Sequence, residues 1–133
     1  MSKILLLLLF SFSLITLKAQ TITFCTKINK EDQCAEKQKR FYIEFGKTSY
    51  IYAVVNLLEE VKCVKVYYKI YHLEKFNKEV YITTLSQDVL PKWKNFWKQI
   101  IFTQEMNYKI YVYDENDKLL TSNVIYLEAD YEN

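Results

Sequence analysis

Glycine, proline and histidine are almost missing from this sequence of 133 residues, in which each occurs once, as Gly46, Pro91 and His72. The lack of glycine excludes a glycine-rich loop that would cradle a phosphate group. Any histidine-dependent catalysis would have to use His72. Turns must form with Asn, Asp and charged residues, and few residues are present that could interrupt the exposed edge of a sheet.

The few residues able to carry out catalysis do not combine into a recognisable site. Cys63 and His72 lie nine residues apart on one predicted strand. That spacing separates them by roughly 30 Å and places them on opposite faces. A zinc site that joins His72 to the three cysteines is an alternative, but no close Cys-x-x-Cys pair supports it. We predict that the protein is not an enzyme and has no catalytic residue, no cofactor and no bound metal.

The N-terminal residues 1–19 have the order of a secretory signal peptide. Lys3 precedes an apolar and hydroxyl run of 14 residues, 4–17, and Ala19 is a small residue suited to cleavage. The run is shorter than the roughly 20 residues that a membrane-spanning helix needs. We predict cleavage after Ala19, a single domain over residues 20–133, no stable membrane insertion after cleavage, and a secreted or periplasmic location.

Export into an oxidising compartment makes the three cysteines candidates for a disulfide. Cys25 and Cys34 flank a short polar loop and are the preferred pair, which leaves Cys63 as a free thiol or as a link to a second chain. Residues 1–19 contain two lysines and no acid, so the remaining chain carries 16 basic and 16 acidic side chains. A formal net charge of zero argues against nucleic acid as a partner.

Alternating apolar and polar residues predict an all-β domain. Strands are expected at residues 41–45, 49–57, 62–73, 79–84, 99–103, 107–114 and 119–128. Gly46 is expected at a turn. The acidic run 114–118 is interpreted as a hairpin turn rather than a loose calcium site, because it lacks the glycine and distal glutamate of an EF-hand loop. This spacing favours an antiparallel β-sandwich of about seven or eight strands.

One segment has helical rather than strand periodicity. Trp93, Phe96, Trp97 and Ile100 recur at the spacing of one helix face, and Pro91 suits the first turn of a helix. We predict a short helical turn near residues 91–97, with Trp93 and Trp97 closing one end of the core. The alternative is that the two tryptophans form a platform for a small carbohydrate or lipid.

The stretch FTQEMNYKIYVYDENDKLLTSN resembles the last two strands of immunoglobulin-like domains. In that fold a tyrosine enters the penultimate strand after a corner, and Tyr108 matches it. The resemblance covers about residues 40–128 and defines no particular family. The sequence lacks the cysteine pair that joins the two sheets of antibody-type domains, and Tyr68 stands where those domains have a central tryptophan.

Two strands that the resemblance makes neighbours alternate most clearly. Their even-numbered residues are predicted to face the core: Val64, Val66, Tyr68, Ile70, Tyr108, Ile110 and Val112. The odd-numbered residues contain only lysine and tyrosine and are predicted to form one outward face: Lys65, Tyr67, Lys69, Tyr71, Lys109, Tyr111 and Tyr113.

A face of lysine and tyrosine suits recognition, because tyrosine gives a large contact area for little loss of conformational entropy. We therefore predict a secreted, non-catalytic module that binds a macromolecule, most simply a protein. The same pattern also fits side chains that only stabilise the sheet. A structural subunit that associates through Cys63 or a strand edge is a further alternative.

Overall fold

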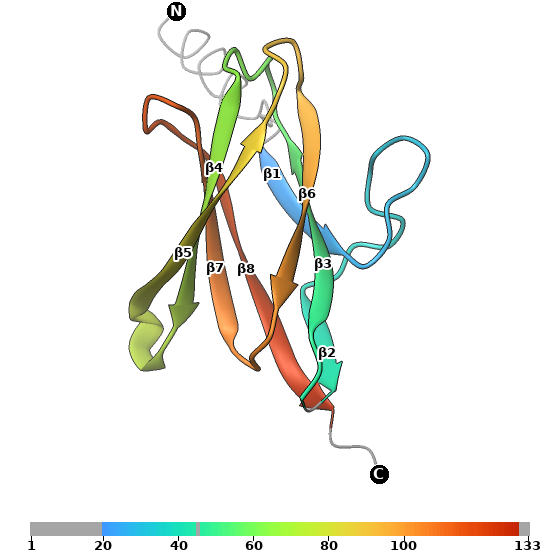
Figure 1. Ribbon diagram of the computed structural model, residues 1–133, viewed down its shortest axis with the longest axis vertical. Coiled ribbons are helices and arrows are strands. Elements are labelled where there is room, and N and C mark those ends of the chain that lie inside the picture. Colours follow the sequence, from blue (N-terminus) through green and yellow to red (C-terminus); the bar gives the residue numbers. More distant parts are fainter. Residues whose placement is uncertain (1–19, 45, 131–133) are drawn as a thin grey trace, which may run out of the picture.

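The computed structural model describes residues 20–44 and 46–130, which form eight strands in two sheets packed face to face (Figure 1). The strands are β1 Thr21–Cys25, β2 Arg40–Glu44, β3 Ser49–Asn56, β4 Lys65–Leu73, β5 Glu79–Asp88, β6 Asn95–Phe102, β7 Asn107–Tyr113 and β8 Leu119–Asp130. The predicted all-β sandwich is confirmed, and β1 is added to the seven predicted strands. The predicted signal peptide, residues 1–19, lies outside the described residues.

The smaller sheet has the strand order β1-β3-β6 and the larger one β2-β8-β7-β4-β5. All neighbours pair antiparallel except β2 and β8, which run parallel. This exception arises because the chain leaves β1 in the smaller sheet and crosses through residues 26–39 to the edge of the larger one. In the described part of the chain, no helix is long and apolar enough to span a membrane.

The core between the sheets follows the predicted alternation. Val66, Tyr68 and Ile70 of β4 and the even-numbered residues of β7 are buried. The Tyr68 hydroxyl donates a hydrogen bond to Gln87 Oε1 at 2.6 Å, so the large side chain at the centre of the core keeps its polar atom paired. The Tyr108 hydroxyl donates to the Gln104 carbonyl at 2.9 Å, which is the corner arrangement that the resemblance implied.

The predicted helical turn near residues 91–97 is wrong. Residues 91–94 form a turn, and residues 95–102 are strand β6, in which Phe96, Ile100 and Phe102 point inward. Positions four apart share a face in a helix and also in a strand, so the Phe96–Ile100 spacing fits both. Trp93 and Trp97 are 39% and 37% exposed, so they do not close the core.

Two predicted turns are present, and one predicted core residue is not buried. Gly46 has φ 78° at the predicted turn between β2 and β3, and residues 114–118 form the predicted hairpin turn, in which Asp114 Oδ1 accepts hydrogen bonds from the Asn116 and Lys118 amides. Val64 was predicted to face the core, but it lies before β4 begins and is 59% exposed.

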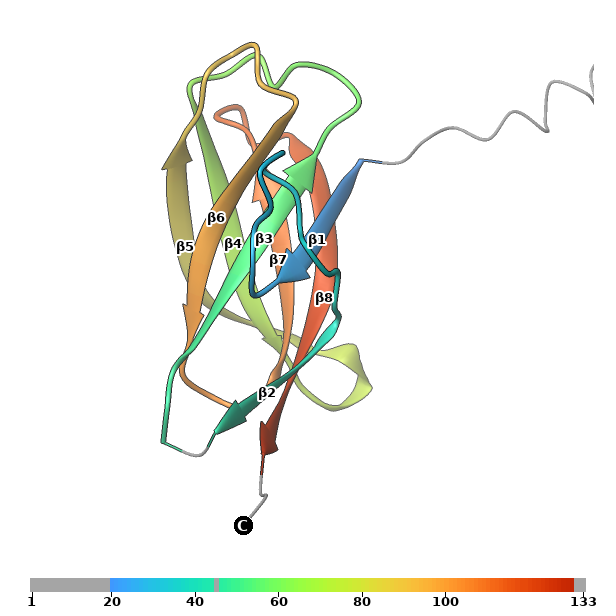
Figure 2. The same ribbon diagram turned by 90° about the vertical axis from the view of Figure 1, so that its right-hand side faces the viewer.

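The two sides of the sandwich differ (Figure 2). On one side β1 lies against β8, and Asn123 Nδ2 donates a hydrogen bond to the Ile22 carbonyl at 2.9 Å. On the other side β5 and β6 are each the last strand of their sheet. They are bridged at one end by Gln87, whose Nε2 donates to the Trp97 carbonyl at 2.7 Å. The sandwich is therefore open along most of the β5/β6 side.

Candidate functional site

The structure brings the seven predicted lysine and tyrosine residues together on the outer surface of the larger sheet. Strands β4 and β7 are direct neighbours, with Tyr67 opposite Tyr113, Lys69 opposite Tyr111, and Tyr71 opposite Lys109. All seven are partly exposed. We call this surface the Tyr/Lys face: Lys65, Tyr67, Lys69, Tyr71, Lys109, Tyr111 and Tyr113.

Neighbouring tyrosine rings contact one another in the middle of the Tyr/Lys face. The ring of Tyr71 contacts the ring of Tyr111 edge to face, with centroids 5.5 Å apart, and contacts Tyr81 of β5 in the same way at 5.6 Å. Tyr111 also lies 6.2 Å from Tyr113, measured between ring centroids. In packed structures, each such pair contributes roughly 0.5–1.5 kcal/mol of stability in addition to the effect of the apolar area that it buries. These contacts favour one arrangement of the rings in the absence of a partner.

The lysines lie over these rings. Lys69 Nζ is 4.7 Å from the centroid of Tyr113, and Lys109 Nζ is 5.1 Å from that of Tyr111. These distances are within the range of cation–π attraction, which is worth roughly 0.5–1 kcal/mol at exposed sites. Lys65 instead approaches Asp88 of β5, with 3.9 Å between Nζ and Oδ1. The three ammonium groups are thus spread across the Tyr/Lys face.

Glu79 of β5 is a second acid that contacts this surface, in addition to Asp88. Its carboxylate accepts a hydrogen bond from the Tyr111 hydroxyl and lies 3.6 Å from Lys109 Nζ. The pKa of Lys109 is raised, first by its interaction with Tyr111 and then by Glu79. Burial and the bond to Glu79 raise the pKa of Tyr111. At neutral pH the phenol is therefore protonated and the lysine is charged.

Sequence reasoning missed the residues that extend the Tyr/Lys face on both sides. Tyr81 and Glu79 of β5 border β4, while Arg40 of β2 lies over the ring of Tyr126 of β8 at 5.0 Å. Tyr42 of β2 is 67% exposed on the same outer surface. The alternation within residues 79–84 and 41–45 could have placed Tyr81 and Tyr42 outward, but it could not show which strands adjoin.

A similar fold occurs in a protein of very different sequence. An immunoglobulin-like protein from Pseudomonas aeruginosa matches with a TM-score of 0.50 and 9% identity, over 81% of this chain and 92% of that one. The chain has an immunoglobulin-like fold. No protein-family model and no curated protein matches the sequence.

Two other solved structures resemble this immunoglobulin-like domain at lower scores. One is the CARDB domain of a Pyrococcus furiosus protein, in complex with di-metal ions, with a TM-score of 0.44 and 12% identity over 87% of this chain and 100% of that one. The other is a superoxide reductase, neelaredoxin, from Ignicoccus hospitalis, with a TM-score of 0.44 and 8% identity over 84% and 81%. Among residues 20–44 and 46–130, no cluster of three His, Cys, Asp or Glu side chains could hold a metal ion.

The cysteines of the immunoglobulin-like domain pair as predicted. Cys25 and Cys34 form a disulfide that holds the loop following β1 against the smaller sheet, and it covers Val54. Cys63 is free and half-buried, and its thiol contacts the Lys65 carbonyl at 3.4 Å. Burial raises the pKa of the Cys63 thiol. Whether this thiol or a strand edge links two chains stays a prediction.

The two tryptophans lie beside a separate hollow of about 680 Å³, bordered by Glu31 and Asp32 of the disulfide loop. Trp97 Nε1 donates to Asp32 Oδ1 at 3.3 Å, and the Trp97 ring contacts Tyr52 edge to face at 5.3 Å. These contacts tie Trp97 to the loop and the smaller sheet. That the tryptophans bind a carbohydrate or lipid stays an unfavoured alternative.

Proposed function

We propose that this immunoglobulin-like domain is an exported, non-catalytic module that binds a protein partner through the Tyr/Lys face. The observation that carries the proposal is the contiguity of the face. Seven lysine and tyrosine side chains from two neighbouring strands form one partly exposed surface with no apolar residue among them. Export is supported by the Cys25–Cys34 disulfide, which is typical of oxidising compartments.

The contacts among the tyrosines favour binding. A side chain that is already ordered loses little further entropy when a partner covers it. The edge-to-face contacts of Tyr71 with Tyr111 and Tyr81 provide this order, and the tyrosine rings offer both apolar area and hydroxyl groups. The surface therefore combines rigidity with hydrogen-bonding capacity, as protein recognition sites do.

The charges of the Tyr/Lys face favour a protein over a polyanion. Asp88 lies near Lys65, and Glu79 lies near Lys109, so two of the three lysines have an acid within 4 Å. Nucleic-acid surfaces need several cations free to neutralise phosphates. A mixed surface of this kind instead suits a partner with interspersed acidic and polar groups.

Phe76 adds an exposed apolar side chain at the tip of the hairpin whose strand β4 contributes to the Tyr/Lys face. Phe76 lies in the short segment η1 Lys75–Asn77, where its own backbone angles are not helical, at the tip of the β4–β5 hairpin, which stands off the end of the larger sheet (Figure 1). Its side chain is fully exposed. An exposed aromatic side chain is the kind of residue that becomes a binding hot spot when a partner covers it.

The proposal is tested by replacing Tyr67 and Tyr111 together with serine. Affinity capture by the chain lacking residues 1–19, from the native extracytoplasmic fraction, followed by mass spectrometry, identifies the partner, and the variants are then titrated with that partner. We expect at least about thirtyfold weaker binding, since buried aromatic hot spots contribute about 2 kcal/mol or more. The thermal midpoint should fall, because Tyr111 loses its ring contacts and its hydrogen bond to Glu79, but circular dichroism should show that the variant is still folded at the temperature of the titration.

Tyr50→Ser is the matched control. Tyr50 is 53% exposed and belongs to the smaller sheet, away from the Tyr/Lys face. The Tyr50→Ser substitution should leave the affinity for the partner unchanged. Equal binding by the wild type and the double variant would refute the proposed surface.

A further inference from the structure

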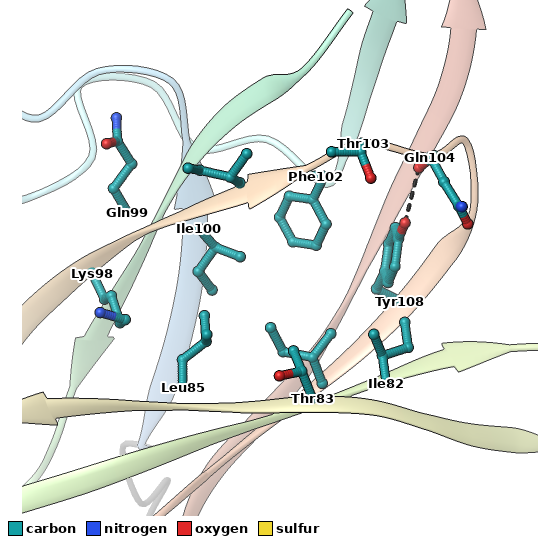
Figure 3. Close-up of a pocket in the computed structure, with 12 residues that line it drawn as sticks. Ile82, Thr83, Leu85, Lys98, Gln99, Ile100, Phe102, Thr103, Gln104 and Tyr108 are labelled. Atoms are coloured by element: carbon teal, nitrogen blue, oxygen red, sulfur yellow. Dashed lines mark hydrogen bonds between the residues drawn. The ribbon is translucent and has the colours of Figure 1, made fainter. Parts of the chain in front are cut away.

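A groove lies between the edges of the two sheets, where β5 and β6 face each other across the open side of the sandwich. Its volume is about 410 Å³, which is within the usual range for small-molecule sites. Figure 3 shows Ile100 and Phe102 pointing from β6 toward Leu85 and Thr83 of β5, while Tyr108 closes one end. The groove is thus an uncovered extension of the core.

The β5 wall of this groove is shaped by a bulge. Ile70 of β4 pairs with Thr83, and the next residue, Tyr71, pairs with Tyr81, so Ile82 has no partner on β4. Its side chain lines the groove and is 44% exposed. A bulge of this kind redirects a side chain that regular pairing would have placed elsewhere. Here it supplies an apolar rim.

One charged side chain lines the groove, and it is Lys98. It occupies an inward position of β6, between the buried Phe96 and Ile100, and Figure 3 places it at the end opposite Tyr108. No described residue forms an ion pair or hydrogen bond with its ammonium group. The groove therefore has a positive charge at one end and an apolar lining along its length.

We propose that this groove binds a single-chain amphipathic carboxylate, with the carboxylate at Lys98 and the hydrocarbon chain running toward Tyr108. The charge of Lys98 matches the head of such a ligand, and the side chains of Ile82, Leu85, Ile100 and Phe102 match its tail. The site is separate from the Tyr/Lys face, which lies on the outer surface of the larger sheet. The two proposals therefore stand or fall independently.

Lys98 has one other physical explanation. An inward-pointing charge on an edge strand discourages that edge from pairing with another chain. On that explanation the lysine would affect aggregation and would bind no ligand. The experiment must therefore measure ligand affinity and association separately.

The test uses calorimetric titration of the chain lacking residues 1–19 with decanoate, dodecanoate and tetradecanoate, each below its micellar concentration. We expect saturable 1:1 binding that tightens about tenfold for each two added methylenes until the groove is filled. Dodecanol should bind about tenfold more weakly than dodecanoate, because it cannot form a charge-assisted bond with Lys98.

Variants of Lys98 test the head-group contact. Lys98→Met should weaken dodecanoate binding about tenfold while keeping the apolar stem, and Lys98→Glu should also favour dodecyltrimethylammonium over dodecanoate. Lys94→Glu, in the turn before β6, is the matched control and should change neither affinity. The Tyr67→Ser/Tyr111→Ser variant should bind dodecanoate as the wild type does.

Three results would overturn the proposal. They are no saturable dodecanoate binding, equal affinity for dodecanoate and dodecanol, or unchanged dodecanoate binding by folded Lys98→Met protein. Aggregation of the Lys98 variants, with no dodecanoate binding by the wild type, would assign the lysine to edge protection alone.

Discussion

Phe76 has a backbone conformation that its side chain disfavours. Its φ is 61°, in the left-handed region, where residues other than glycine, Asn and Asp are uncommon. Its side chain is fully exposed, so no packing within the domain offsets this strain. We predict that Phe76→Asn raises the free energy of unfolding by about 1 kcal/mol, measured by urea denaturation.

The Phe76 prediction has a control at the same position. Phe76→Val should lower the free energy of unfolding, because a β-branched residue tolerates positive φ less well than phenylalanine does. If Phe76 contacts the partner, Phe76→Asn should at the same time weaken partner capture. A loss of stability in Phe76→Asn would instead show that the phenylalanine packs within the domain.

At the scale of the element, the direction of backbone groups in β6 can be deduced from two hydrogen bonds. The Trp97 carbonyl accepts from Gln87 of β5, and the Lys94 carbonyl accepts from the Leu57 amide that follows β3. Successive residues of an antiparallel strand point their amides in opposite directions. The even-numbered residues of β6 therefore pair with β3, and Gln99 and Ile101 direct their amides to the free edge.

This deduction predicts the hydrogen exchange of β6. The amides of Gln99 and Ile101 should exchange with solvent deuterium at least a hundredfold faster than those of Lys98 and Ile100, as measured residue by residue by NMR. If a carboxylate occupies the groove without adding backbone bonds, the contrast should persist. Slow exchange at Gln99 and Ile101 would mean that another strand covers this edge.

Strand β6 also shows where sequence reasoning failed. Its inward positions are Phe96, Lys98, Ile100 and Phe102, and the apolar residues Trp97 and Ile101 point outward, so the polar–apolar rhythm is reversed at three positions. Trp97 is outward because it packs against Tyr52 of β3, and Lys98 is inward because the edge is open. Both reasons are tertiary, and a window of sequence does not contain them.

Strands β4 and β7 were predictable because each has one face buried in the core and one face that is partly exposed to solvent. There the period-2 pattern identified the core residues except Val64, and it grouped the seven residues of the Tyr/Lys face. It could not identify Glu79 or Phe76, because their roles depend on the β4–β5 hairpin lying next to β7 in the folded sheet. The groove was unpredictable for the same reason, since β5 and β6 meet only in the folded chain.

At the scale of the whole molecule, stability depends on keeping Tyr68 neutral. Its ring is fully buried between the sheets, and burial raises the pKa of its phenol far above the ordinary value of 10. In the unfolded chain the same phenol ionises near pH 10. The native state thus holds a proton that the unfolded state releases, so this contribution is complete below pH 10 and is lost as the pH rises further.

We therefore predict that the free energy of unfolding falls above pH 10 more steeply in the wild type than in Tyr68→Phe. The difference in slope should approach about 1.4 kcal/mol per pH unit, the limit for one proton. At neutral pH the variant should be about 1 kcal/mol less stable, because it leaves the Gln87 oxygen without its hydrogen bond. The two curves should accordingly converge between pH 10 and about pH 11. Urea denaturation from pH 7 to 11.5 measures the difference at neutral pH and the difference in slope. All other titrating groups are the same in the wild type and the variant, so their effects cancel in the comparison. Parallel curves would mean that the Tyr68 phenol ionises in the folded protein as readily as in the unfolded chain, and so that this part of the core is open to water.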